Sequence, residues 1–165
     1  DVQGLRHLLN NPADLQQQVR SLLDEQKNLQ KEIADLKNHQ AMSLKTDLLS
    51  RFEDFTGVNV LVARVPVEDG KLAKNLIYAV GKEKENALIV FGFVEKDKPN
   101  LMIYVDETLA GARQISASVM VRQLATHIQG GGGGQAFFAT AGGKELGGLD
   151  KALSEAKVLF VNQFK

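Results

Sequence analysis

The residues with the clearest chemical potential are glycines near the end of the chain. They are Gly130, Gly131, Gly132, Gly133 and Gly134 in a row, and then the pair Gly142 and Gly143. No side chains cover the peptide N–H groups of consecutive glycines, so these groups can form a concave row of donors that binds an anion such as phosphate. The same lack of side chains also lets a chain pass close beneath a neighbouring element. The sequence leaves these two explanations open.

The glycine run matches neither of the standard phosphate-binding motifs. A dinucleotide-binding fingerprint follows a strand and opens a helix, whereas here a helical pattern precedes the run and a strand pattern follows it. A P-loop ends in lysine and then serine or threonine, but Gly134 is followed by Gln135 and Ala136. An anion contact here would therefore depend on backbone N–H groups and on cations from elsewhere in the chain.

The remaining reactive side chains do not form a catalytic set. The three histidines are scattered without metal-ligand spacing, and there is no cysteine. Asp106 and Glu107 directly follow a predicted strand, but carboxylates in that position more often cap the next turn than act as acid and base. No segment brings an acid, a base and a nucleophile together. We predict neither a metal site nor a catalytic residue.

The segments on either side of the glycines predict an internal loop of one domain rather than a linker. Apolar residues with helical spacing predict a helix over 113–129, and a dense apolar segment predicts a short strand over 136–139. A flexible linker would instead be diluted with serine, proline or charge.

The N-terminal part predicts one long helix with a narrow apolar stripe. Apolar residues recur at alternating steps of four and three, interrupted by Gln26 and Gln40. The predicted seam consists of Leu15, Val19, Leu22, Leu29, Ile33 and Leu36. A stripe this narrow suits a single helical partner. We expect first an upstream helix that forms an antiparallel hairpin with this one, and second another copy of the chain.

Beyond residue 43 the pattern becomes that of a globular domain. Strands are predicted over Val58–Val65, Ala87–Val94 and Leu101–Val105, with helices over 70–81 and 149–159 in addition to the helix before the glycines. We therefore predict an α/β (α+β) fold. Residues 1–43 form a coiled-coil-like helical segment, and residues 44–165 form a small mixed sheet with packed helices.

Composition and charge narrow the classes of function. The chain has 165 residues with 20 basic and 20 acidic side chains, so its formal net charge is zero. A dedicated nucleic-acid binder usually has a basic excess, so any such contact must use a local patch or backbone donors. A membrane-spanning helix needs about 20 apolar residues in sequence, and no such run occurs. The lack of cysteine fits a reducing compartment, and the start at Asp1 without methionine or a signal pattern suggests a fragment of a longer protein.

The leucine-rich helix, the small mixed domain and the stretch GGGGGQAFFATAGG after an apolar helix resemble the C-terminal region of alanyl-tRNA synthetases. The globular part resembles the DHH-associated domain, which also occurs in phosphodiesterases of small nucleotides. The resemblance implies a cytoplasmic, non-catalytic part of a ligase that contacts the elbow of alanine-accepting tRNA, supports the upstream catalytic and editing domains, and in some members forms a homodimer. It also implies that ATP, magnesium and zinc bind only upstream.

The resemblance carries the glycine role over to Gly130–Gly134 and Gly142–Gly143. If a nucleic acid binds there, we expect Arg122 and Lys144, and then Arg113, to be the cations that contact it. The family usually places a basic residue, proline and aspartate directly after the glycines, but this chain has Gln135 and an apolar segment there. The phosphodiesterases place a histidine after a glycine triplet, and its absence argues against hydrolysis. A structural oligomerisation module and a small-nucleotide phosphodiesterase-associated domain are the alternative functions.

Overall fold

The computed structural model describes residues 2–10 and 12–164, and it divides the chain into two compact units, residues 1–40 and 41–165. The first unit contains helix α1 (Val2–Leu8) and most of helix α2 (Leu15–Leu49), whose first turn is capped by Asp14. Its carboxylate accepts the backbone N–H groups of Gln16 and Gln17, which stabilises a helix start. The domain boundary predicted between residues 43 and 44 lies within α2.

The second unit is built on a six-stranded sheet with the order β1-β2-β3-β4-β6-β5. Its strands are β1 (Glu53–Phe55), β2 (Val58–Arg64), β3 (Ala87–Glu95), β4 (Lys98–Val105), β5 (Gly131–Gly134) and β6 (Phe138–Gly142). Strands β2 and β3 are parallel and are joined through helix α3 (Gly70–Gly81), as a parallel pair requires. All other neighbours pair antiparallel, so the predicted mixed sheet with packed helices is confirmed.

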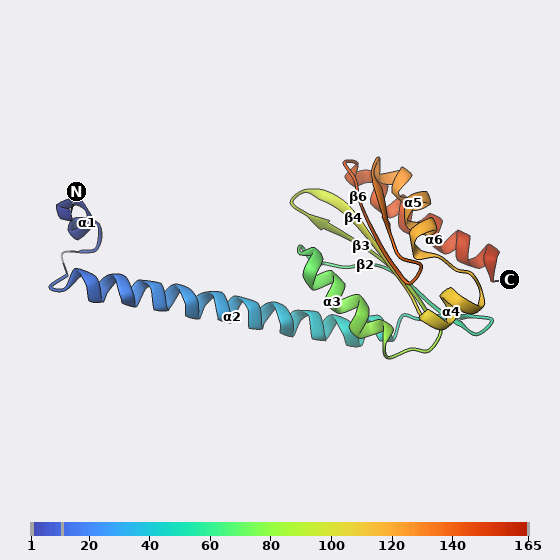
Figure 1. The fold of residues 1–165 in the computed structure, drawn as a ribbon, viewed down its shortest axis with the longest axis horizontal. Helices are drawn as coiled ribbons and strands as arrows, with labels where there is room; N and C mark the ends of the chain where they lie inside the picture. The colour runs from blue at the N-terminus through green and yellow to red at the C-terminus, as the bar shows by residue number, and fades with distance from the viewer. Residues whose placement is uncertain (1, 11, 165) are drawn as a thin grey trace. The chain divides into compact units, whose positions relative to one another are not determined.

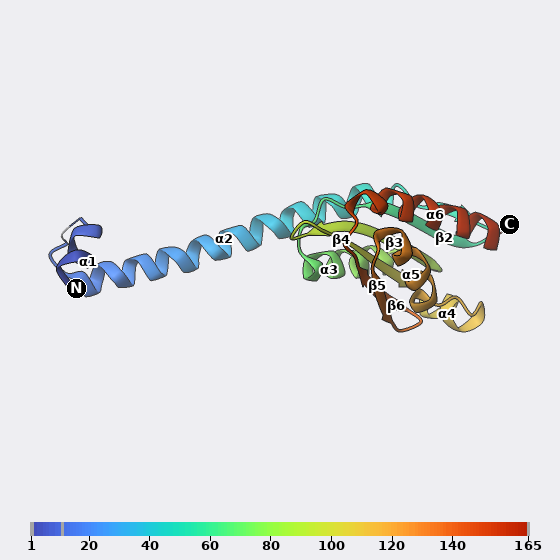
Figure 2. The same ribbon diagram turned by 90° about the horizontal axis from the view of Figure 1, so that it is seen from above.

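Helices cover both faces of this sheet (Figures 1 and 2). On one face, α3 and the last turns of α2 pack against Ile89 and Phe91 of β3. On the other face, helices α5 (Ala117–Ala125) and α6 (Leu149–Gln163) pack against Leu88 and Val90. Because β3 is buried on both sides, its sequence is a nearly continuous apolar run rather than an alternating one.

The helix predicted over 113–129 is wrong in its bounds. The structure instead has helix α4 (Glu107–Ala112), then α5, and then a 3-10 turn η1 (Thr126–Ile128); a second 3-10 turn, η2 (Leu146–Gly148), precedes α6. The chain breaks before α5 because Gln114 has a left-handed backbone conformation, with φ of 54°, and the Ser116 hydroxyl accepts the N–H of Val119.

The glycine run lies inside the second unit, as predicted, but it forms strand β5 and not a loop. Gly131–Gly134 pair antiparallel with Ala139–Gly142, and β5 is an edge strand of the sheet. The strand predicted over 136–139 is displaced accordingly, and β6 begins at Phe138. Glycine has a low preference for strands. Here the close approach of the two backbones holds the run in place.

Candidate functional site

Strand β5 approaches β6 so closely that alternate glycines have no room for a side chain. A Cβ on Gly130 would overlap the carbonyl oxygen of Gly142, one on Gly132 that of Thr140, and one on Gly134 that of Phe138. The other two differ. A Cβ on Gly131 would meet nothing within 4 Å, and one on Gly133 would meet only the Arg122 guanidinium, at 3.7 Å. The fold therefore requires glycine at three positions of the run but not at Gly131 or Gly133.

The register of the β5–β6 hairpin directs some glycine amides outward. The backbone N–H of Gln135 donates to the Phe138 carbonyl (2.7 Å), while Val105 on the other side donates to the Phe137 carbonyl (2.8 Å). Because bonding alternates along an antiparallel ladder, Gly132 and Gly134 point their N–H groups away from β6, toward the open edge of the sheet. The N–H of Gly130 donates to Ala125 (3.0 Å). The edge therefore presents backbone donors that are not covered by side chains.

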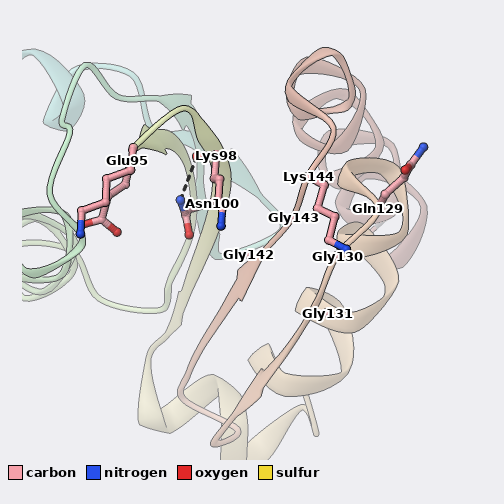
Figure 3. A pocket seen from close by; sticks show the side chains of 10 residues that line it. Glu95, Lys98, Asn100, Gln129, Gly130, Gly131, Gly142, Gly143 and Lys144 are labelled. Atoms are coloured by element: carbon pink, nitrogen blue, oxygen red, sulfur yellow. Dashed lines mark hydrogen bonds between the residues drawn. The ribbon is translucent and has the colours of Figure 1, made fainter.

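A pocket of about 620 Å³ lies at the start of this strand, and we call it the lysine pocket (Figure 3). It is lined by Glu95, Lys96, Lys98, Asn100, Gln129, Gly130, Gly131, Gly142, Gly143 and Lys144. Figure 3 shows Lys98 and Asn100 on β4 on one side and Lys144, just after β6, on the other, while Gln129 points away. Three lysines and one glutamate line the pocket, so its charge favours an anion.

Two hydrogen bonds fix the polar side chains of the lysine pocket. Asn100 donates its amide N–H to the Lys98 carbonyl (3.0 Å), which sets the orientation of its amide. Glu95 accepts the backbone N–H of Gly70 at the start of α3 (3.2 Å), so its carboxylate is held by that helix. The lysines are thus the groups left to meet a ligand's charge.

A groove of about 720 Å³ adjoins the lysine pocket, and we call it the α3 groove. It lies over β6 and is lined by Lys71 and Lys74 of α3, Phe93 and Glu95 of β3, Met102 of β4, Phe138 and Thr140 of β6, and Gly131, Gly132 and Gly133, among others. It shares Glu95, Asn100, Gly131 and Gly142 with the lysine pocket. The two hollows therefore form one continuous surface along the glycine strand.

The structure brings most of the predicted nucleic-acid-binding residues together. Gly130, Gly131, Gly142, Gly143 and Lys144 line the lysine pocket, and Gly131, Gly132 and Gly133 line the α3 groove. Arg122 on α5 lies beside Gly133 but lines neither hollow. Arg113 follows α4, where its guanidinium donates to the Thr56 carbonyl (3.4 Å), and it also lines neither hollow.

Sequence reasoning missed Lys96, Lys98 and Asn100, which lie far from the glycines in the chain. They reach the site because β4 pairs with β6, with Asn100 opposite Gly142. The only local signal was the lysine-rich turn between two predicted strands. It becomes informative once the strand order is known. Lys71 and Lys74 were missed for the same reason, since α3 packs across the sheet.

The predicted seam residues lie along α2. Leu15 is partly buried, whereas the other five are between 42% and 60% exposed, namely Val19, Leu22, Leu29, Ile33 and Leu36. Among the described residues, no group of three or more histidine, aspartate or glutamate side chains is arranged to hold a metal ion. In residues 2–10 and 12–164, no helix is both long and apolar enough to cross a membrane.

The chain is similar to proteins of a known family. Residues 57–162 match the family model of the DHHA1 domain. The chain is 34% identical over 155 residues to the alanine–tRNA ligase of Cytophaga hutchinsonii and 36% identical over 156 residues to that of Christiangramia forsetii. Each alignment covers 94% of this chain but only 18% of the relative, so the chain spans under a fifth of the length of these ligases.

A solved structure has the same fold. The C-Ala domain from Aquifex aeolicus alanyl-tRNA synthetase aligns with a TM-score of 0.58 and 19% identity, over 68% of this chain and 96% of that one. The family match covers most of the second unit, from β2 to α6, and includes the glycine strand and both hollows beside it. The chain therefore belongs to the DHHA1 domain family and is similar to a segment of alanine–tRNA ligases.

Proposed function

We propose that this chain is a non-catalytic part of an alanine–tRNA ligase and that its second unit binds tRNA along the glycine strand. The similarity to alanine–tRNA ligases supports the parent protein. The observation that carries the binding role is the lysine pocket, where Lys96, Lys98 and Lys144 surround bare backbone. Ammonium groups hold the phosphates of a nucleic-acid backbone, and the glycines of this pocket leave room for a phosphate to approach them.

The neutral net charge makes this a local and salt-sensitive contact. Lys96 lies in the β3–β4 turn, Lys98 begins β4 and Lys144 lies just after β6, so three cations line one pocket although the whole chain has no basic excess. Each phosphate neutralised on a duplex costs about 0.9 log units of affinity per log unit of salt. Contacts to two or three phosphates would therefore give a measurable but shallow salt dependence.

The experiment is a fluorescence-anisotropy titration of labelled alanine tRNA at several salt concentrations. Lys98→Ala and Lys144→Ala are each expected to weaken binding about fivefold and to reduce the salt slope by about one. Lys157→Ala is the matched control, because Lys157 is exposed on α6 and lines neither hollow. Equal loss in all three variants, or equal binding of an unrelated acidic polymer such as heparin, would contradict the proposal.

The exposed stripe of α2 favours a second function, which is assembly through that helix. Apolar residues at heptad spacing with side chains more than 40% exposed are costly in water unless a partner helix covers them. We propose that a helix of the parent protein or a second copy covers them. Sedimentation of the chain and of the Leu22→Asp/Leu29→Asp variant distinguishes the two. A dimer lost on substitution supports the second copy, and a monomer in both cases excludes it.

A further inference from the structure

The α3 groove is lined by residues that suit a flat ring. Its floor is apolar, with Met102 and Phe138 on neighbouring strands, and one wall is the side-chain-free backbone of Gly131–Gly133. Sites for small organic groups combine such an apolar floor with a few polar groups that fix orientation. A peptide plane without a side chain also allows a planar ligand to lie flat against it.

Two polar side chains are placed to contact the edge of such a ring. The amide N–H of Asn100 is used by the Lys98 carbonyl, so its Oδ1 atom remains as an acceptor, and it would lie 3.3 Å from a Cβ on Gly142. Thr140 is exposed, and its hydroxyl makes no hydrogen bond within the part of the chain that the structure describes. Thr140 is opposite Met102 and Asn100 is opposite Gly142, so the two side chains lie two register positions apart on neighbouring strands. An acceptor and a hydroxyl are the groups that pair with the donors and acceptors on a nucleobase edge.

The aromatic ring in the groove is held in place and already attracts a cation. The Lys74 ammonium lies 5.2 Å from the centroid of the Phe138 ring, and the Tyr78 ring lies 5.2 Å from it at 35°. Tyr78 therefore packs against Phe138. Lys74 is a long, exposed side chain that can move aside. Bases stack on aromatic side chains in single-stranded RNA recognition, and cations flank them to meet the phosphates.

We propose that the α3 groove binds one unstacked nucleobase of an RNA whose adjacent phosphate lies in the lysine pocket. This rests on the proposed RNA-binding function, which assigns the phosphate contact to the lysine pocket, and it adds a contact to the base. The two hollows share Asn100, Gly131 and Gly142, so a base in one and its phosphate in the other can belong to a single nucleotide. The charges around the groove also suit an anionic RNA. Lys71 and Lys74 line it, and the carboxylate of Glu95, which lines it too, accepts the Gly70 N–H.

The test uses two short single-stranded RNAs at low salt that differ at one central position. One carries 2-aminopurine there and the other an abasic residue, so their phosphates are identical. We expect the abasic RNA to bind about tenfold more weakly, and the 2-aminopurine fluorescence to be quenched on binding. Equal affinities together with unchanged fluorescence would overturn the proposal.

A substitution in the groove links this readout to the site. Thr140→Val keeps the β-branched shape of an exposed strand residue, so we expect it to leave the fold intact. It should weaken binding of the 2-aminopurine RNA about threefold and leave binding of the abasic RNA unchanged. Thr46→Val, on the exposed side of α2, is the matched control and should change neither. Equal effects of Thr140→Val on both RNAs would contradict a contact to the base.

The outcomes also separate this inference from the function on which it rests. If labelled tRNA binds with the expected salt dependence but neither short RNA distinguishes the base, the groove proposal fails and the lysine pocket stands. If tRNA and both short RNAs fail to bind, the proposed function fails together with the groove. If tRNA binds and neither short RNA does, the groove proposal alone is overturned.

Discussion

A β-carbon on Gly132 would overlap the backbone carbonyl oxygen of Thr140, because β5 and β6 approach at the distance of bare backbones. The neighbouring Gly131 faces open space. Neighbouring glycines of one run are therefore present for different reasons. Gly132 is demanded by the fold, and Gly131 is free of internal constraint and lines both hollows.

Alanine substitutions should separate these two causes. Gly132→Ala should lower the free energy of unfolding by about 1–3 kcal/mol, because the added methyl forces β5 away from β6. Gly131→Ala should leave it unchanged or raise it by up to about 1 kcal/mol, because it reduces the entropy of the unfolded chain. Urea denaturation of both variants measures this. Equal destabilisation would show that the strand geometry is not as described.

The same Gly131→Ala variant should bind tRNA more weakly despite its intact fold. Gly131 lines both hollows and a Cβ there would meet nothing within 4 Å, so the added methyl group would occupy open space beside the ligand and hold it away from the backbone. A loss of about threefold to tenfold is expected in the anisotropy titration, which corresponds to about 1 kcal/mol. Unchanged affinity would mean that the ligand does not approach this part of β5.

The sequence predicts that Arg113 contacts nucleic acid, whereas its position in the structure predicts that it does not. Its guanidinium donates to the Thr56 carbonyl beyond α4, and it lines neither the lysine pocket nor the α3 groove. We expect Arg113→Ala to leave tRNA affinity within about twofold of the unsubstituted chain, as for a surface charge remote from the ligand. Lys144→Ala, measured beside it, should show the larger loss. The reverse order would move the binding surface to α4.

Some features of this fold can be predicted from short stretches of sequence, and others cannot. The apolar run of β3 predicts a strand buried on both faces, and Asp106 was predicted to cap a turn. Its carboxylate accepts the N–H groups of Thr108 and Asn86, as that prediction requires. These features depend on short-range patterns, in which side-chain periodicity and capping chemistry act within a few residues.

The glycine strand and the lysines around it could not be predicted from short-range sequence patterns. Glycine carries no side-chain periodicity, so a glycine strand looks like a loop until its partner is known. Lys96 and Lys98 join Gly142 only through the pairing of β4 with β6, which the sequence does not state. The site therefore depends on sheet order, while the elements that carry it depend on local pattern.

The last turns of α2 should contribute strongly to the stability of the second unit. Leu48 is 1% exposed and packs in the same core cluster as Leu61 and Ile77. Leu48→Ala should lower the free energy of unfolding by about 2–4 kcal/mol, because it removes buried methyl groups and leaves a cavity. Leu36→Ala is the control on the same helix, at 60% exposure, and should change it by less than about 0.5 kcal/mol. Urea midpoints of the two variants give the comparison.

Lys45 should make the stability of the second unit depend on pH in the acid range. Its ammonium donates to the Glu83 carboxylate (2.7 Å), and this hydrogen bond, with the charge of Lys45, lowers the pKa of Glu83 below its ordinary 4.5. A lowered pKa means that the unfolded chain binds the proton more readily. The stabilisation is therefore present above pH 4.5 and is lost as the pH falls through the folded-state pKa.

Substituting Lys45 tests this coupling directly. In Lys45→Met, the pKa of Glu83 followed by NMR titration should return to its ordinary value, and the free energy of unfolding should depend less steeply on pH below 4.5. Lys157→Met removes a lysine that forms no ion pair within residues 2–10 and 12–164, and it should leave the Glu83 titration unchanged. Because Glu83 is exposed, the effect should also shrink as salt is added, since ions screen surface pairs. A Glu83 pKa that stays low in Lys45→Met would assign the shift to a group other than Lys45.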